Sequence, residues 1–176
     1  MISNSFIGFG FAKYNFKGAN VLFFAALCTM FLPGTVMTVP MYVVWSKLQL
    51  TNTYVPLCIG AFFGSAMDIF LMRQCFKSLP GGLYEAALID GAHPILIYAR
   101  IYMPLARPML ATLGLRTFIG SWNSLFGPLV YITSKEKYTI TLGLQYLKTK
   151  YELEKQNLLM AAAILAMLPT LIVYIF

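Results

Sequence analysis

The stretch Tyr84-Glu85-Ala86-Ala87-Leu88-Ile89-Asp90-Gly91-Ala92, which runs on to Ile101-Tyr102-Met103-Pro104, is a polar island in an otherwise apolar sequence. It reads as Glu-Ala-Ala, three residues, glycine, nine residues, isoleucine, one residue, and then a hydrophobic residue followed by proline. Asp90-Gly91 predicts a tight turn, because glycine adopts a positive φ without steric cost. Pro94 suits the first position of a helix, where its missing N–H needs no partner. Two short helices in an elbow are therefore predicted, from Tyr84 to Ile89 and from Pro94 to about Tyr102.

The composition of the chain indicates whether it folds in water or in a membrane. Of its 176 residues, 59% are hydrophobic and 11% are charged, whereas soluble domains carry about 25% charged residues. A soluble core of this size could not bury the apolar residues that give a mean hydropathy of +0.72. The net charge of +7 comes from lysines and arginines that flank apolar runs and do not cluster with aromatic residues. A membrane protein is predicted, with lipid as a partner and no nucleic acid.

Four apolar stretches are candidates for membrane spans, since a span needs about 20 helical residues. They are residues 21–45, 54–76, 104–132 and 158–176. A helix is expected in each, because a helix satisfies its own backbone hydrogen bonds in lipid. The predicted fold is all-α, a polytopic helical bundle with about four spans forming a single domain over residues 1–176. The elbow occupies residues 77–103, between the second and third spans.

Two segments of this plan carry more specific expectations. Pro33-Gly34 and Pro40 interrupt the first stretch, so residues 35–39 are expected to be irregular or to begin a new helix. Residues 133–157 are expected to form a solvated loop with one amphipathic turn near Tyr146 to Tyr151. Basic residues divide equally between the two sides of the membrane, so their distribution does not assign an orientation.

Residues suited to catalysis or metal binding are scarce. The chain has no GxxxxGK[ST] loop for ATP, and its three cysteines lie in apolar surroundings without metal-ligand spacing. The only histidine, His93, precedes a proline, which favours a turn or a helix cap over catalysis. No catalytic residue, metal site or cofactor is predicted.

Four polar or aromatic residues inside the predicted spans are candidates for a translocation path. Asp68 and Arg116 are ionisable, and such residues are costly in a membrane unless they are paired or hydrated. They either face a water path or a partner subunit, or Asp68 lies nearer the interface and Arg116 reaches out to it. Trp122-Asn123 combines an aromatic face with an amide, as sugar sites do. An interfacial aromatic anchor beside small packing residues is the structural alternative for this pair.

Several motifs along the chain resemble permease subunits of binding-protein-dependent ABC importers for carbohydrates. These motifs are Leu32-Pro33-Gly34, Val39-Pro40-Met41-Tyr42, Ile69-Phe70-Leu71-Met72-Arg73-Gln74, the Glu85-Ala86-Ala87 loop, Trp122-Asn123 and Leu168-Pro169. The resemblance covers effectively the whole chain and is nearer to the maltose G-type subunit than to the F-type one. It implies a multi-pass protein of the bacterial inner membrane with the elbow in the cytoplasm.

The resemblance also implies roles and partners. Glu85, Ala86, Ala87, Asp90, Gly91, Ile101 and Pro104 would form the element that sits in a cleft on an ATPase. The implied partners are a second permease subunit, two ATPase subunits and an extracellular or periplasmic sugar-binding protein. ATP hydrolysis would belong to the ATPase, so this chain is not expected to be an enzyme.

Three departures from the family pattern bear on these expectations. Met103 replaces the usual leucine before Pro104, and Asp68 and Arg116 stand where uncharged residues are usual. Such permeases usually have six spans and a basic C-terminal tail, so the chain is expected to be truncated at both ends. The alternatives are an importer of glycerol phosphate or a peptide, and a fragment that does not transport. A membrane enzyme would require Asp68, His93 and Arg116 to converge.

Overall fold

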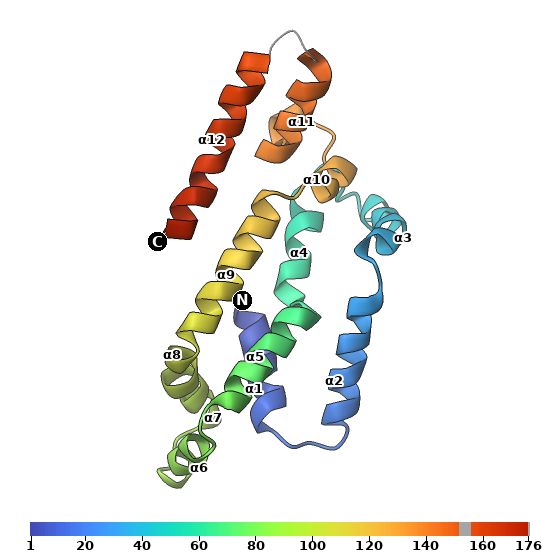
Figure 1. The fold of residues 1–176 in the computed structure, drawn as a ribbon. Coiled ribbons are helices and arrows are strands. Elements are labelled where there is room, and N and C mark those ends of the chain that lie inside the picture. Colours follow the sequence, from blue (N-terminus) through green and yellow to red (C-terminus); the bar gives the residue numbers. More distant parts are fainter. Residues whose placement is uncertain (152–155, 176) are drawn as a thin grey trace. The chain divides into compact units, whose positions relative to one another are not determined.

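The computed structural model describes residues 1–151 and 156–175, in which helices are connected by turns and no strand occurs (Figure 1). The predicted all-α class is therefore confirmed. By its internal contacts the chain divides into two compact units. The first is Met1–Val36 with Gly60–Gly114, and the second is Met37–Ile59 with Leu115–Phe176. The prediction of a single domain over residues 1–176 stays a prediction.

Most of the helices are short. In chain order they are α1 (Ile2–Lys13), α2 (Ala19–Cys28), η1 (Thr29–Phe31), α3 (Gly34–Lys47), α4 (Val55–Phe63), α5 (Ala66–Ser78), α6 (Gly82–Ile89), α7 (Pro94–Ile97), η2 (Tyr98–Tyr102), α8 (Met103–Leu105), α9 (Arg107–Trp122), α10 (Phe126–Tyr131), η3 (Lys135–Lys137), α11 (Ile140–Tyr151) and α12 (Gln156–Ile175). Of the three η segments, η1 and η3 are 3₁₀-helices and η2 is a π-helical turn.

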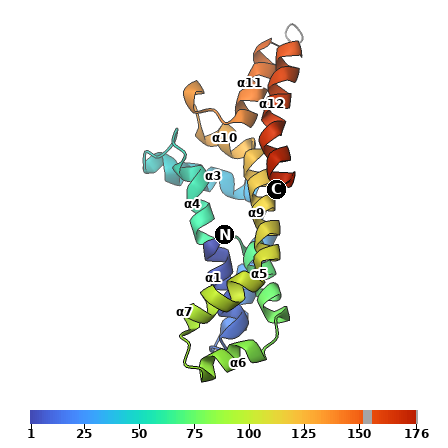
Figure 2. The same ribbon diagram turned by 90° about the vertical axis from the view of Figure 1, so that its left-hand side faces the viewer.

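The first unit is built on the packing of α1 along α5, which lie side by side in both views (Figures 1 and 2). Gly8 makes this approach possible, because a Cβ there would lie 2.8 Å from Met72 Cβ and 3.1 Å from the Arg73 nitrogen. Around this contact lies an aromatic core in which the Phe9 ring meets the rings of Phe76 and Tyr102 edge-on. The elbow packs against the same core, so α1 and α5 support the elbow.

A break between α4 and α5 is held by a side chain from α1. Gly64 has φ +88°, and the Asn4 Oδ1 atom accepts a hydrogen bond from the Ser65 amide at 2.9 Å. The Asn4 Nδ2 atom donates to Asp68 Oδ2 at 3.0 Å. Asp68 lies in the first turn of α5, where a carboxylate is favourable to the helix dipole. Asn4 therefore binds both the amide and the carboxylate at the new helix start.

The first predicted span is a bent pair of helices. Residues Ala19–Phe31 and Gly34–Lys47 meet at 95°, with the break at Leu32-Pro33. A new helix thus begins at Gly34, which is one of the two expected outcomes for residues 35–39. Pro40 does not interrupt it and lies inside α3. Prolines are tolerated within helices of membrane proteins because other groups satisfy the freed backbone positions.

The second unit is held together by the packing of α11 against α12 and by hydrogen bonds of Asn52 between two loops. Helices α11 and α12 lie side by side in both views (Figures 1 and 2). Asn52 Oδ1 accepts hydrogen bonds from the amides of Thr133 and Ser134, at 3.1 and 3.0 Å. Its own carbonyl accepts from Lys137 Nζ at 2.7 Å. These bonds fix the segment that follows α10 against the segment that precedes α4.

Two predicted segments differ from the structure. The predicted span 104–132 is divided among α8, α9 and α10, and α9 itself has 16 residues. The predicted loop 133–157 contains the 12-residue helix α11, where one amphipathic turn was expected. Thr139 directly precedes α11 and caps its start, because its Oγ1 accepts a hydrogen bond from the Leu142 amide at 3.4 Å. Residues 152–155 of the predicted loop lie outside the described residues.

Within the described residues, two helical segments are long and apolar enough to cross a membrane: Val55–Ser78, which comprises α4 and α5, and Gln156–Ile175. The bent pair raises this number to three if it forms one span. The prediction of about four spans exceeds this, because α9 is too short to be counted by itself.

Candidate functional site

The elbow lies beyond the end of α5 and consists of α6, a turn and α7 (Figure 2). The predicted pair of short helices is confirmed, with α6 beginning at Gly82, two residues before the expected start at Tyr84. Glu85 lies in the first turn of α6, as predicted, where its carboxylate is favourable to the helix dipole. Its side chain is exposed.

The turn after α6 explains why the motif contains glycine at position 91. The Ala92 amide donates to the Ala87 carbonyl at 2.9 Å, and the Gly91 amide donates to the Leu88 carbonyl at 3.0 Å. This pair of bonds is a Schellman motif, which requires a left-handed residue directly after the C-cap. The C-cap is Asp90, and Gly91 follows it with φ +76°. The predicted Asp90-Gly91 turn is therefore confirmed, and its backbone satisfies the end of the helix.

His93 and Pro94 start the second arm of the elbow. The His93 Nδ1 atom accepts a hydrogen bond from the Ile95 amide at 3.3 Å, so the histidine caps α7 as predicted. Pro94 occupies the start of the helix, where no amide is needed. From there the chain is helical through the π turn η2 and α8. A π turn is rare and occurs frequently at functional positions.

The inner face of the elbow is anchored in the aromatic core of the first unit. Ala87 is 7% exposed and belongs to the same buried cluster as Phe9. On the second arm Tyr98 is buried, and its hydroxyl is 2.6 Å from Ser5 Oγ on α1. Tyr102 is fully buried, with Lys13 Nζ 4.8 Å from its ring centroid. These contacts attach the elbow to α1 and α5.

Tyr84 closes the edge of this core. Its ring packs edge-on against Phe9 and Tyr102. Partial burial, followed by hydrogen bonding with Tyr14, raises the pKa of Tyr84 above its ordinary value. Both effects favour the neutral phenol, so Tyr84 contributes packing and no charge to the elbow.

The outer face of α6 is short, apolar and carries one negative charge. Glu85 and Ala86 are exposed, and Ile89 is 86% exposed. These residues lie three and four positions apart and therefore share one face of the helix. Of the two alanines, only Ala86 is available to a partner, because Ala87 is buried in the core of the unit. Ile89 was not among the predicted site residues, although its spacing from Glu85 identifies it.

The remaining motif residues lie on the second arm. Ile101 is half-buried and packs against the core cluster, whereas Pro104 is exposed within α8. The first part of the motif therefore lies on α6, which presents the outer face, and the last part lies on the second arm, which anchors the elbow.

The four candidates for a translocation path are distributed between the two units. Asp68 is 5% exposed in the first unit and is bonded to Asn4, while Arg116 is exposed on α9 in the second. Trp122 and Asn123 line a cavity of about 380 Å³ together with residues of α11 and α12. The Trp122 indole donates to the Ala166 carbonyl at 3.0 Å, and Thr141 Oγ1 donates to the Trp122 carbonyl at 2.8 Å. These two bonds attach Trp122 to α11 and α12, and the role of Trp122-Asn123 in a translocation path stays a prediction.

Chemistry at these positions is restricted. Among the described residues, no three His, Cys, Asp or Glu side chains lie where they could hold a metal ion. His93 caps a helix in the elbow, and it uses its Nδ1 atom for this purpose.

The chain is all-helical, has helices long and apolar enough to cross a membrane, and carries a two-helix elbow, which is the architecture expected of a permease subunit. The chain belongs to the family of binding-protein-dependent transport system inner membrane components, which matches residues 4–176. The predicted family is therefore confirmed, and the chain is an integral membrane protein.

Relatives of known role have similar sequences. The arabinooligosaccharides transport system permease protein AraQ of Halalkalibacterium halodurans is 32% identical over 176 residues, covering 100% of this chain and 62% of that protein. The lactose transport system permease protein LacG of Rhizobium radiobacter is 30% identical, covering 99% of this chain and 63% of that protein. The sn-glycerol-3-phosphate transport system permease protein UgpE of Salmonella typhi is 34% identical over 166 residues, covering 94% of this chain and 59% of that protein. The chain thus spans about three fifths of the length of these relatives.

One solved structure has a similar fold. It is the crystal structure of a bacterial ABC transporter involved in the import of the acidic polysaccharide alginate. It superposes with a TM-score of 0.84 at 25% identity, covering 99% of this chain and 67% of that chain.

Proposed function

We propose that this chain is the permease subunit of an ATP-driven importer of sugars or oligosaccharides, a multi-pass protein of the bacterial inner membrane. The observation that carries the proposal is the elbow, whose outer face on α6 is exposed and whose inner face is buried in the core of the first unit. Its partners are a second permease subunit, two ATPase subunits and an external sugar-binding protein. The relatives named for arabinooligosaccharides and lactose support this substrate class.

The elbow is suited to transmit force. Glu85 offers one charge to a cationic partner, and Ile89 offers an apolar side chain that is 86% exposed. Between them Ala86 lets a partner surface approach closely. A push on this face is carried inward by Ala87 and by the second arm, because both are buried against α1 and α5. Energy from the ATPase becomes movement of the membrane helices.

The path for the substrate is assigned to Trp122, Asn123, Asp68 and Arg116. The Trp122–Asn123 cavity of about 380 Å³ has the size of a small-ligand site and offers an aromatic surface, an amide and two threonine hydroxyls. Glycerol phosphate is the alternative substrate class, because the UgpE protein is 34% identical to this chain. A cationic residue would be needed for a phosphate, and Arg116 is the candidate within the second unit.

Co-purification with a candidate ATPase subunit from the same organism tests the coupling role. Wild type is expected to retain the ATPase, and Glu85→Lys and Ile89→Asp are expected to lose it at least tenfold, since both change the outer face of α6. Lys77→Glu is the matched control, because it reverses one exposed charge at the end of α5 outside that face. Equal retention by all four proteins would refute the assignment of the outer face as the ATPase contact.

A further inference from the structure

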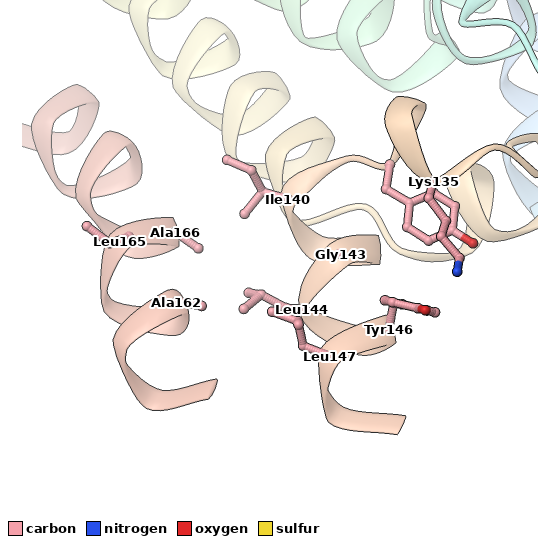
Figure 3. Close-up of a pocket in the computed structure, with 10 residues that line it drawn as sticks. Lys135, Ile140, Gly143, Leu144, Tyr146, Leu147, Ala162, Leu165 and Ala166 are labelled. Atoms are coloured by element: carbon pink, nitrogen blue, oxygen red, sulfur yellow. The ribbon is translucent and has the colours of Figure 1, made fainter. Parts of the chain in front are cut away.

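A groove between α11 and α12 combines an apolar wall with cations. Its volume is about 500 Å³, and Figure 3 shows how its wall is made. From α11 it is lined by Ile140, Leu144 and Leu147, which recur at helical spacing. Ala162, Leu165 and Ala166 of α12 line the other side. We call this cleft the α11/α12 groove. An aliphatic chain would fit such a surface.

One edge of the groove is cationic and aromatic. Lys135 lines the groove, and its Nζ lies 5.0 Å from the Tyr146 ring centroid. Lys150 does not line the groove, but its Nζ lies 5.9 Å from the same centroid. Tyr138 packs edge-on against the same ring at 5.8 Å. Hydrogen bonding with Tyr146 raises the pKa of Lys135. The acidic neighbour Glu136 lies in the chain beside Lys135 but does not line the groove.

The part of α12 that lines the groove falls within one leaflet of a membrane. Helix α12 has 20 residues and is one of the candidate spans. Ala162 and Ala166 are six and ten positions after Gln156, roughly 9 and 15 Å along the helix axis at 1.5 Å per residue. The hydrocarbon core of a bilayer is about 30 Å thick, so the groove lies in the first half of the span. Tyrosines are typical of the boundary between headgroups and acyl chains.

We propose that the α11/α12 groove binds one anionic phospholipid, with its phosphate beside Lys135 and Lys150 and one acyl chain between the two helices. The apolar wall selects an acyl chain, and the two ammonium groups select a negative headgroup over a zwitterionic one. The site is separate from the elbow, and it shares Leu144 and Ala166 with the Trp122–Asn123 cavity. It rests on the placement of α12 in a membrane and not on transport.

The test measures which lipid stays with the protein. The 176-residue chain is reconstituted in nanodiscs with equal amounts of phosphatidylglycerol and phosphatidylcholine and is then extracted in detergent. Bound lipid is counted by mass spectrometry. Wild type is expected to retain phosphatidylglycerol at least fivefold over phosphatidylcholine. Lys135→Gln is expected to lower this preference about fivefold, the effect of one lysine charge on anionic lipid near a membrane surface.

Two further variants separate the parts of the site. Gly143→Leu fills the groove, and nothing lies within 4 Å of a Cβ at this position, so the fold can accept the side chain. It is expected to lose bound lipid of both kinds while circular dichroism shows unchanged helix content. Lys148→Gln removes an exposed lysine of α11 that does not line the groove, and it is expected to retain phosphatidylglycerol as wild type does.

Three outcomes would overturn the proposal. Equal retention of the two lipids by wild type would leave an apolar groove without headgroup selection. An equal loss in Lys135→Gln and Lys148→Gln would mean general surface charge. Displacement of phosphatidylglycerol by inorganic phosphate, with Gly143→Leu binding phosphate like wild type, would assign the lysines to a free anion.

Discussion

Asn4 and Asp68 are joined by a hydrogen bond of 3.0 Å from Asn4 Nδ2 to Asp68 Oδ2, although 64 positions separate them in the chain. The other polar atom of the same amide accepts from the Ser65 backbone at 2.9 Å. One side chain of α1 therefore stabilises the break between α4 and α5 from both sides. Both residues are buried, so water does not replace these bonds easily.

Replacing Asn4 should destabilise the first unit. In Asn4→Leu, the buried Asp68 loses a donor, which costs about 1–3 kcal/mol, and the part-buried Ser65 amide loses its acceptor at a smaller cost. The expected result is a free energy of unfolding lowered by about 2–4 kcal/mol, measured by denaturant titration in detergent. Asn20→Leu on the exposed side of α2 is the control and should change it little. Equal effects of the two variants would contradict the role of Asn4.

Gly8 should be intolerant of any side chain. A Cβ there would lie 2.8 Å from Met72 Cβ, so Gly8→Ala must push α1 away from α5. Overpacking of this kind costs about 1–3 kcal/mol. Gly10→Ala, two positions further along α1, meets nothing within 4 Å and should be neutral or stabilising by up to about 1 kcal/mol. The two variants are compared by thermal unfolding in the same detergent, and the same shift in both would disprove the close contact.

Gly91 should be required for the geometry of the elbow and not for space. A Cβ at position 91 meets nothing within 4 Å, but its φ of +76° costs an L-residue about 1–2 kcal/mol. Gly91→Ala is therefore expected to destabilise the turn of the elbow and to weaken the coupling of ATP hydrolysis to transport. Gly91→Asn should have a smaller effect on the turn and on the coupling, since asparagine tolerates this conformation. The readout is the transport-stimulated ATPase rate in the assembled complex. Gly81→Ala, at φ −62°, is the control and should leave that rate unchanged.

The elbow could be predicted from sequence because its signals are local. Gly91, His93 and Pro94 each determine the backbone within a few residues, and all three have the roles that their residue types favour. The π turn η2 has no comparable signal, since its sequence Tyr-Ala-Arg-Ile-Tyr is compatible with an ordinary helix. The outer residue Ile89 could have been found from its helical spacing to Glu85.

Other parts of the structure depend on contacts that a sequence does not reveal. Asp68 was considered as a residue facing water or a partner subunit, and its bond to Asn4 joins two distant segments. The sequence of α11 predicts a loop with one turn, because its lysines obscure the apolar face of Ile140, Leu144 and Leu147. That face becomes meaningful only beside α12, which packs against it.

Tyr146 should be the tyrosine whose ionisation depends on Lys135. Hydrogen bonding with the Lys135 ammonium lowers the pKa of Tyr146 below its ordinary value of 10.0, and Lys150 adds to this effect. Absorbance at the tyrosinate wavelength is therefore expected to rise at lower pH in wild type than in Tyr146→Phe. Lys135→Met should shift this early component to higher pH, whereas Lys148→Met should leave it in place.

The sign of the associated stability change follows from the direction of the shift. Because the folded state favours the tyrosinate, the pairing of this phenolate with the Lys135 ammonium stabilises the fold in alkaline solution, and it is lost again as pH rises through the raised folded pKa of Lys135. The contribution is present above the unfolded pKa of Tyr146 and is lost as pH falls through the lowered folded pKa. Lys135→Met should consequently lower thermal stability more above about pH 9–10 than at pH 7, where only the contact of the ammonium with the Tyr146 ring is lost. An equal loss at both pH values would mean that Lys135 stabilises the second unit through that contact and not through the phenolate.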